Sequence, residues 1–468
     1  MMRPLGKTGL KVYPLGFGCY RVEDGNPIHE QALRAYLKAG GNLIDTSANY
    51  TDGLSEQLIG KVLKDTSRED VVVVTKAGYI QGRNMDLARN HDFPETVKYG
   101  EDLWHCIHPD FLDLQLKLSA ERLQVETVNV FLLHNPEYFL SDKGRLGRVS
   151  EADQDEFYRR IREAFLFLEE AVRGGRIQCY GISSNHFGYP LSNPEAVKID
   201  RCLSIAGEIS AEHHFQVVQF PLNLFEPGAA LEKNNGGLTA LEFCGKNGIG
   251  VLTNRPLNAF AGGRMLRLAD FAAPGGKPPG LEALKKILEP LREVEIRFAE
   301  TFSASREETP DVADRLEEIL PKIQSTAHFE HAAGPFIIDP IRRWLAQVHA
   351  ELEDDPKWPA WQKAFAEGVN RAIEEMGRYV AARDQKTSDA VRELLFEAGF
   401  PRGNAEQEPL SRMAVGVLLS LPGLSAALAG MRRPEYVRDL MGLPDRPPVE
   451  GASILKNLEP PAGARFEA

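Results

Sequence analysis

The chain has 468 residues, of which 43% are hydrophobic and 26% are charged, and its formal net charge is −12. This length is ample for a large buried core, and the composition is ordinary for a soluble globular protein. The negative charge argues against general nucleic-acid binding, because phosphates would be repelled. The sequence contains no run of about 18 apolar residues, so a membrane span is not expected.

Cysteine usage and the N-terminal stretch bear on the compartment. Five cysteines are scattered without a C-x-x-C pair, and M-M-R-P-L-G-K-T-G-L lacks the apolar core of a signal peptide. These features predict reduced thiols in a cytoplasmic protein. His328 and His331 form H-F-E-H, but two histidines without further ligands are more often polar surface than a metal site. No metal is therefore expected.

In chain order, a small hairpin over residues 3–13 is followed by strands and helices in alternation. The expected strands are 15–19, a short segment ending near Asp45, 71–75, 127–133, 177–182, 215–220 and 249–253. The expected helices are 28–39, 54–63, 110–123, 154–173, 193–210 and 229–246, with a loop at 77–108. Seven such alternations predict a parallel sheet, which an eighth unit closes into a barrel.

The eighth unit is delayed by a segment of different composition. Between Gly263 and about Phe400 the chain is rich in Glu, Lys, Arg, Leu and Ala and shows no convincing strand. Helical patterns are found at 281–302, 311–323, 340–353, 358–382 and 388–398. The alternation resumes with a helix at 411–420, a strand at 424–429 and a helix starting at Pro434. The segment is large enough to form a helical subdomain.

The fold predicted from this order is an α/β protein, a (β/α)8 TIM barrel with an N-terminal hairpin and an all-α insertion between strands 7 and 8. The predicted divisions are 1–264 for the hairpin and the first seven strands, 265–400 for the helical insertion, and 401–442 for the last barrel unit. Residues 443–468, rich in Pro and Gly, are expected to be a C-terminal tail on the surface.

Four polar residues stand at the carboxyl ends of predicted strands or in the loops just beyond them. Asp45 and Tyr50 lie in N-L-I-D-T-S-A-N-Y, Lys76 ends V-V-V-V-T-K, and His134 ends V-F-L-L-H. Barrel enzymes place catalysis at this face, so the four residues are predicted to meet there. Each residue type alone is more often structural, but the four consistent positions favour a proton-handling site.

The order of several motifs resembles the aldo-keto reductase family, in the broad branch with bacterial and plant members active on sugars and aryl aldehydes. The motifs are L-G-K-T-G-L…P-L-G-F-G, G-G-N-L-I-D-T-S-A-N-Y…G-L-S-E-Q-L-I-G, V-V-T-K, L-S-A-E-R-L with L-L-H-N-P, Y-G-I-S-S-N and A-G-M-R-R-P-E-Y-V. The resemblance covers residues 3–264 and 408–440, and the insertion lies outside it.

The resemblance implies an enzyme, an NAD(P)H-dependent oxidoreductase that reduces an aldehyde or ketone by direct hydride transfer. Tyr50 would protonate the carbonyl oxygen, and Lys76 beside it is expected to lower the tyrosine pKa from about 10. Asp45 would orient Lys76, and His134 would hydrogen-bond the substrate oxygen.

The resemblance also implies cofactor contacts. Within S-S-N, Ser184 and Asn185 match the residues that bind the nicotinamide carboxamide, Gln219 matches a glutamine on the sixth strand, and Gly18 and Cys19 match the first-strand turn. Gly430, Met431 and Arg432 fall where the family holds the adenosine phosphate. Arg432 or Arg433 could pair with a 2′-phosphate, which favours NADPH, with NADH as the alternative.

Two departures from the family pattern stand out. Many relatives stack a tyrosine on the nicotinamide after the seventh strand, whereas this chain has Asn254 or Arg255 there; Arg255 and Leu257 are still expected to line the cofactor groove. The insertion is the second departure. It could cover the substrate pocket, pack on the barrel's flank, or mediate oligomerisation.

Two rival functions stay open beside a carbonyl reductase. One is a cofactor-sensing regulatory subunit on the same barrel, against which the intact set of four residues weighs. The other is an NAD-dependent sugar dehydrogenase that works in the oxidative direction. The expected partner is a small-molecule carbonyl substrate, and neither nucleic acid nor a membrane is expected.

Overall fold

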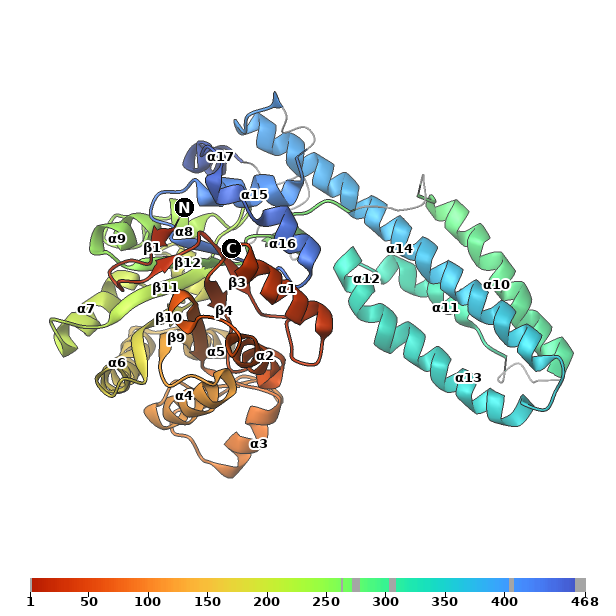
Figure 1. The fold of residues 1–468 in the computed structure, drawn as a ribbon, viewed down its shortest axis with the longest axis horizontal. Helices are drawn as coiled ribbons and strands as arrows, with labels where there is room; N and C mark the ends of the chain where they lie inside the picture. The colour runs from red at the N-terminus through yellow and green to blue at the C-terminus, as the bar shows by residue number, and fades with distance from the viewer. Residues whose placement is uncertain (1, 262–263, 272–277, 303–308, 404–407, 459–468) are drawn as a thin grey trace. The chain divides into compact units, whose positions relative to one another are not determined.

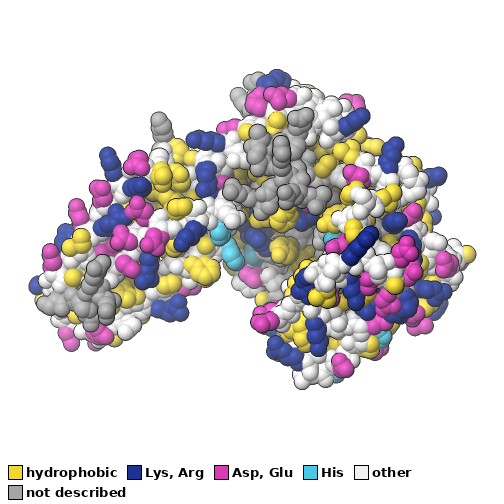
Figure 2. Space-filling view, turned by 180° about the vertical axis from the view of Figure 1, so that it is seen from behind, with side chains coloured by type: hydrophobic (Ala, Val, Ile, Leu, Met, Phe, Trp, Pro, Cys, Tyr) yellow, Lys and Arg dark blue, Asp and Glu magenta, His cyan; other side chains and the backbone are white. Residues whose placement is uncertain are grey.

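The computed structural model describes residues 2–261, 264–271, 278–302, 309–403 and 408–458. The chain divides into two compact units: a barrel unit, Met1–Leu268 with Leu394–Ala468, and an insertion unit, Ala269–Glu393. Figure 1 shows strands ringed by helices in the barrel unit and a bundle of helices in the insertion unit. On the face seen in Figure 2, acidic and basic side chains are interspersed over each unit.

The barrel unit is built on a closed ring of eight parallel strands, in the order β10-β11-β12-β15-β3-β4-β5-β9. These strands are β3 (Leu15–Gly18), β4 (Leu43–Asp45), β5 (Val72–Ala77), β9 (Val128–His134), β10 (Ile177–Ser183), β11 (Phe215–Pro221), β12 (Gly250–Asn254) and β15 (Ala426–Ala429). The ring confirms the predicted (β/α)8 barrel, with the insertion between its seventh and eighth strands.

Helices connect successive strands, as parallel pairing requires. They are α1 (Pro27–Lys38), α2 (Leu54–Leu63), α4 (Pro109–Leu123), α6 (Glu151–Arg173), α7 (Ile199–Ile209), α9 (Ala240–Asn247), α15 (Leu410–Leu419) and α16 (Pro434–Leu440). Within the described residues, no helix is long and apolar enough to cross a membrane.

The barrel interior is an aliphatic core fed by alternate residues of the strands. Its buried members include Leu43, Val74, Leu132, Val217 and Leu252. The N-terminal hairpin, β1 (Arg3–Pro4) paired with β2 (Lys11–Val12), adds Leu5 and Val12 to the same cluster. Because successive residues of a strand point to opposite faces, residues two positions further along each strand also point inward.

The insertion unit packs helices around aromatic rings. The helices are α10 (Leu281–Phe302), α11 (Val312–Ile319), α12 (Thr326–Ala332), α13 (Asp339–Leu352) and α14 (Trp358–Glu397), the last of which ends in the barrel unit. Trp361 stacks on Trp358 and Phe365, with ring centroids 5.5 and 4.9 Å away, and donates from Nε1 to the Val294 carbonyl at 2.8 Å. The two helices expected at 358–382 and 388–398 are one continuous helix.

The segment 77–108 differs from the single loop expected there. It holds a three-stranded antiparallel sheet and a helix, β6 (Tyr79–Ile80), α3 (Arg83–Asn90), β7 (Val97–Lys98) and β8 (Trp104–His105). Strands of two residues carry too little alternation to be read from a sequence. An unexpected helix, α5 (Tyr138–Leu146), also follows β9.

The helix expected at 229–246 is interrupted. The chain forms α8 (Gly228–Leu231) and then a loop before α9. Gly236 and Gly237 adopt φ values of +60° and +81° in this loop, a conformation that a right-handed helix excludes. The Asn234 side chain donates to the Phe187 and Tyr189 carbonyls, both at 2.8 Å, which anchors the loop.

Two further expectations are corrected near the insertion and at the C-terminus. A hairpin of β13 (Asn258–Ala261) and β14 (Arg264–Arg267) extends into the stretch where no strand was expected. The expected tail contains α17 (Gly451–Asn457), with Ile454 and Leu455 buried, whose apolar spacing is too short to stand out among prolines. Residues 459–468 of that tail lie outside the described residues.

Candidate active site

The two-residue alternation of side chains along the strands positions the residues of the candidate site. Asp45, Lys76, His134 and Gln219 each stand two residues beyond a member of the barrel's aliphatic core, respectively Leu43, Val74, Leu132 and Val217. The same alternation directs their side chains into the barrel at its carboxyl end. The strand register sets Gly18 opposite Asp45, and Ser183 opposite both His134 and Gln219. The site is therefore the polar layer that closes the apolar core.

Lys76 is the centre of this layer. Its ammonium nitrogen lies 2.7 Å from Asp45 Oδ1, 2.7 Å from the Thr46 carbonyl and 3.4 Å from the Tyr50 hydroxyl, so each of its three protons has an acceptor. The other Asp45 oxygen accepts from Gln219 Nε2 at 2.7 Å. Tyr50 stands in the one-turn helix η1 (Tyr50–Gly53) just beyond β4.

Asp45 and Lys76 form a buried ion pair. Burial raises the pKa of Asp45, and Lys76 and Gln219 act against this rise. Burial tends to lower the pKa of Lys76, but the charge of Asp45 and the hydrogen bonds outweigh it, so this pKa is raised. Both carboxylate oxygens and all three ammonium protons are satisfied, which favours the charged form of both groups.

Tyr50 differs from expectation in its acidity. Burial raises its pKa to about 12, although Lys76 acts in the opposite direction as the sequence predicted. The phenol is therefore protonated at neutral pH. Because it accepts the hydrogen bond from Lys76, its own O–H proton is left to be donated elsewhere.

The His134 side chain packs against aromatic rings, and its backbone contacts the small sheet within residues 77–108. The Tyr79 ring lies edge-on at 4.7 Å and the Tyr50 ring at 5.8 Å. His105 Nε2 donates to the His134 carbonyl at 2.7 Å. Burial, with the nearby charge of Lys76, lowers the pKa of His134 well below its usual value, so the imidazole is neutral.

The residues expected at the nicotinamide carboxamide lie beside this group, after β10 (Ser184 and Asn185) and on β11 (Gln219). The Gln219 carbonyl accepts from the Ser184 backbone N–H at 2.9 Å, and the Gln219 side-chain oxygen accepts from Ser183 Oγ at 3.2 Å. The Ser184 hydroxyl caps the turn by accepting from His186 N at 3.1 Å. Asn185 N donates to the carboxylate of buried Glu137 at 2.7 Å.

The expected residues on β3 and after β15 are brought together by strand pairing. The Cys19 N–H donates to the Asp45 carbonyl at 2.9 Å, and β15 pairs with β3 through Ala429 and Phe17. Gly430 and Met431 follow directly, and the Met431 side chain is buried. A Cβ on Gly18 would stand 3.3 Å from the Ala429 carbonyl oxygen, so this approach favours glycine.

Arg255 and Leu257 lie in the loop after β12, and Arg432 lies in the loop after β15. Arg432 is half-buried just before α16. Arg255 adopts a left-handed φ of 53° and pairs with Glu226 at 2.8 Å. The Leu257 carbonyl accepts from Leu268 N at 2.9 Å.

Asn254 was named from the sequence as a candidate after the seventh strand, whereas Glu137 and Ser47 were not singled out. Asn254 donates to the Gln219 side-chain oxygen at 3.3 Å, while its own buried Oδ1 has no hydrogen-bond partner among the described residues. Glu137 is 2% exposed and likewise has one unpartnered oxygen. Ser47 Oγ lies 2.9 Å from His134 Nδ1. For Ser47 the signal was present in the sequence, since this residue stands two positions beyond Asp45.

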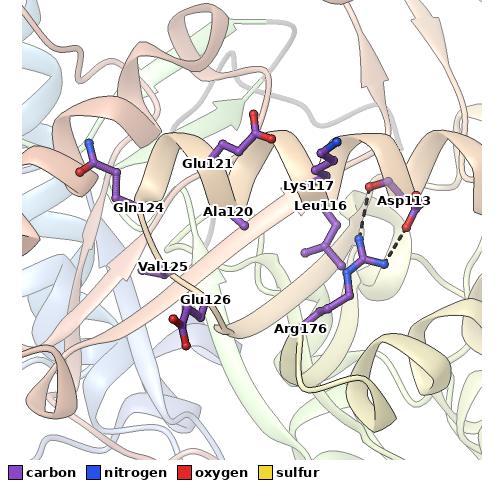
Figure 3. Close-up of a pocket in the computed structure, with 9 residues that line it drawn as sticks. All are labelled: Asp113, Leu116, Lys117, Ala120, Glu121, Gln124, Val125, Glu126 and Arg176. Atoms are coloured by element: carbon purple, nitrogen blue, oxygen red, sulfur yellow. Dashed lines mark hydrogen bonds and ion pairs between the residues drawn. The ribbon is translucent and has the colours of Figure 1, made fainter.

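A surface depression lies outside the candidate site. It encloses about 610 Å³ between α4 and the segments that lead into β9 and β10, where Arg176 pairs with Asp113 at 2.6 Å (Figure 3). These segments enter the amino ends of the strands, opposite the end that carries Asp45 and His134. The depression is therefore not the candidate site. The described residues contain no group of three or more metal-ligating side chains.

The chain is similar to several known proteins. The chain is 29% identical over 140 residues to the NADH-specific methylglyoxal reductase of Escherichia coli, covering 28% of this chain and 40% of that protein. It is 30% identical over 214 residues to L-galactose dehydrogenase of Arabidopsis thaliana, covering 43% and 55% respectively. An aldo-keto reductase structure from Bacillus halodurans, in its holo form, is 21% identical, with a TM-score of 0.38 over 63% of this chain and 76% of that one.

The chain thus spans about half the length of these curated relatives. The sequence model of the Aldo/keto reductase family matches residues 14–307. This range is more than half of the chain and includes all four catalytic candidates. The resemblance found in the sequence is confirmed: the chain belongs to the aldo/keto reductase family.

Proposed function

We propose that this chain is an NAD(P)H-dependent oxidoreductase that reduces an aldehyde or ketone to an alcohol, with Tyr50 as the general acid. The observation that carries the proposal is the chain of contacts from Asp45 through Lys76 to the Tyr50 hydroxyl. Family membership supports the reaction class.

A nicotinamide cofactor, when bound, would supply the hydride for such a reaction. As the carbonyl carbon accepts it, the carbonyl oxygen gains negative charge and needs a proton. Tyr50 holds that proton at neutral pH, since its pKa lies far above 7. Lys76 stabilises the phenolate that remains after transfer, and Asp45 keeps Lys76 charged and oriented. His134 is assigned to the same substrate oxygen.

The residues around Gln219 fit a nicotinamide carboxamide. This group offers one acceptor and two donor protons, and Asn254 Oδ1, next to Gln219, is a buried acceptor without a hydrogen-bond partner among the described residues. Such buried oxygens are normally satisfied, which supports a ligand that donates protons there. Ser184, Asn185 and Gln219 are assigned to hold it. Asn254 and Arg255 are the two candidates to contact the nicotinamide after the seventh strand. Asn254 is favoured, because it contacts Gln219 while the Arg255 guanidinium is paired with Glu226.

Cofactor choice is assigned to the segment after β15. Arg432 and exposed Arg433 precede α16, and a guanidinium matches a 2′-phosphate in charge and geometry. Gly18, Cys19, Gly430 and Met431 line the adjoining turns, and Arg255 and Leu257 the far side of the groove. NADPH is therefore the proposed cofactor, with NADH as the alternative.

A sugar dehydrogenase is the second candidate, favoured by the similarity to L-galactose dehydrogenase. One screen separates the two. Aldehydes, ketones and 2-oxoaldehydes would be offered with NADPH or NADH, and aldoses with NADP⁺ or NAD⁺, each against a Tyr50→Phe protein. We expect Tyr50-dependent reduction to be the faster reaction. Faster oxidation of aldoses would select the second function, and no turnover by either route would contradict both.

A further inference from the structure

The Ser47 hydroxyl contacts His134. It has one proton to donate but lies within hydrogen-bond distance of more than one acceptor atom. It is fully buried, two residues beyond Asp45. Its oxygen lies 2.9 Å from His134 Nδ1, 2.7 Å from an amide atom of Asn49 placed as Oδ1, and 3.2 Å from the Lys76 carbonyl. A hydroxyl has a single proton, so its direction decides the state of its neighbours.

His134 is neutral and so carries one ring proton. The titratable groups that face it are Lys76 from β5, Tyr50 from η1, Tyr79 from β6 and His105 from β8. Burial and the nearby positive charge oppose a second proton. If the single proton is on Nε2, the ring can donate to a carbonyl oxygen; if it is on Nδ1, Nε2 can only accept. The proposed reduction requires the first form.

We propose that Ser47 is a positioning residue that donates its proton to His134 Nδ1 and so holds the Nε2–H form of the imidazole. This inference rests on the proposed function. The competing acceptors are weaker: the Lys76 carbonyl already accepts from Ala48 N at 3.0 Å and is the most distant. The two atoms of the Asn49 amide exchange places when it is turned over, and it then donates to Ser47.

The turned amide also completes a consistent network. Asn49 contacts the Gln81 amide at 3.2 Å, and an amide pair can hydrogen-bond in either direction. The hydrogen bonds then all point the same way. Half-exposed Gln81 donates to Asn49, Asn49 donates to Ser47, and Ser47 donates to His134 Nδ1. The ring's remaining Nε2–H is left for the substrate oxygen. Asn49 and Ser47 then each have one donor and one acceptor partner in this line.

The direct test reads the ring nitrogens by NMR in the full-length protein labelled with ¹⁵N-histidine. The His134 signals among the eleven histidines are identified by their loss in His134→Gln. We expect the Nε2–H pattern in the parent protein and in Ser47→Thr, and a shift toward Nδ1–H in Ser47→Ala. Ser55→Ala removes another buried hydroxyl, which contacts Thr46 at 2.7 Å, and should leave the pattern unchanged. An Nδ1–H pattern in the parent, or no change in Ser47→Ala, overturns the proposal.

Kinetics supply a second readout. Ser47→Ala should lower kcat for carbonyl reduction by roughly 3- to 10-fold, the effect of one hydrogen bond, with cofactor Kd unchanged. In a His134→Gln background the same substitution should have no further effect, because it acts through the ring. Equal losses in both backgrounds would show a merely structural role. If the parent reduces no carbonyl, the proposed function fails, while the NMR result still decides whether Ser47 sets the tautomer.

Discussion

The two units bury different chemistry. The barrel unit holds charged and polar side chains inside, among them Asp45, Lys76 and Glu137, whereas Glu295 and Ser388 are the buried polar side chains among the described residues of the insertion unit. A closed ring of strands satisfies the backbone of its members and fixes where each side chain points. A helical bundle relies on side-chain packing for its arrangement. The barrel can therefore carry chemistry at its core, while the insertion depends on its aromatic cluster.

The largest loss of stability is expected from a substitution at the centre of the aromatic cluster in the insertion unit. Trp361→Ala should destabilise the insertion unit by about 3–5 kcal/mol, because a large buried ring in contact with several others leaves a cavity. Three of the four tryptophans belong to the insertion, so tryptophan fluorescence during urea unfolding would follow it. NADPH binding by the barrel unit should survive.

A matched control is Trp344→Ala, at the half-buried edge of the same cluster, where a smaller loss is expected. Equal losses for the two tryptophans would mean that the cluster has no packed centre. Loss of cofactor binding together with the fluorescence change would show that the two units unfold as one, and the contrast between them would fail.

In the barrel, the decisive change removes one oxygen. Tyr50→Phe should reduce carbonyl turnover by roughly 10²-fold or more, the usual contribution of a positioned acid, with nearly normal cofactor binding. Steady-state kinetics and a fluorescence titration of NADPH would measure both. Tyr158→Phe makes the same change at a buried phenol that accepts from Lys198 N, away from the site. Turnover within about tenfold of the parent in Tyr50→Phe would contradict the assignment.

A smaller effect is expected at the cofactor phosphate. Arg432→Ala with Arg433→Ala should weaken NADPH binding by about 1.5–3 kcal/mol, the scale of a lost charge-assisted hydrogen bond. NADH lacks the 2′-phosphate and should be affected much less. Arg438→Ala, an exposed arginine on α16 that pairs with Glu435, is the control. Equal weakening of both cofactors would place the phosphate contact elsewhere.

The smallest energetic effect, and the one that tests what the insertion adds to the barrel, comes from its removal. We expect the insertion to narrow the range of carbonyl substrates that the enzyme accepts. Replacing Ala269–Glu393 by a short Gly/Ser linker keeps Leu395 and Phe400, which are buried. NADPH binding should remain measurable, and activity on bulky aldehydes should rise. An unchanged substrate profile with a changed oligomeric state, measured by light scattering, would make the insertion an assembly element.

The sequence predicted the parts of the fold that rest on long periodic patterns. Uninterrupted apolar strands such as Val72–Ala77 and striped helices such as Leu281–Phe302 can be read from spacing alone. The four catalytic candidates could be found because each stands at the end of a strand or in the loop just beyond it, and strand ends meet in a barrel. Their roles stay predictions, since the geometry brings them together without testing the chemistry.

What the sequence could not predict depends on contacts between distant segments. The two-residue strands β6, β7 and β8 exist because they pair with one another and pack Tyr79 and His105 against His134. The sign of the Tyr50 pKa shift was missed because burial, which opposes Lys76, is a property of the folded site. The partners of Ser47 and Glu137 likewise become visible only when the loops after neighbouring strands come together.

The place of β15 in the chain has a consequence during synthesis. This strand closes the ring by pairing with both β12 and β3, yet it follows the end of β12 by about 170 residues. At ribosomal rates of roughly 5–20 residues per second, the edges of β12 and β3 that β15 will pair with stay unpaired for about 10–35 s while the insertion is synthesised. Open strand edges invite association with other chains. A nascent barrel of this kind is thus exposed to aggregation for longer than one with a short final connection, and slower translation would lengthen that interval.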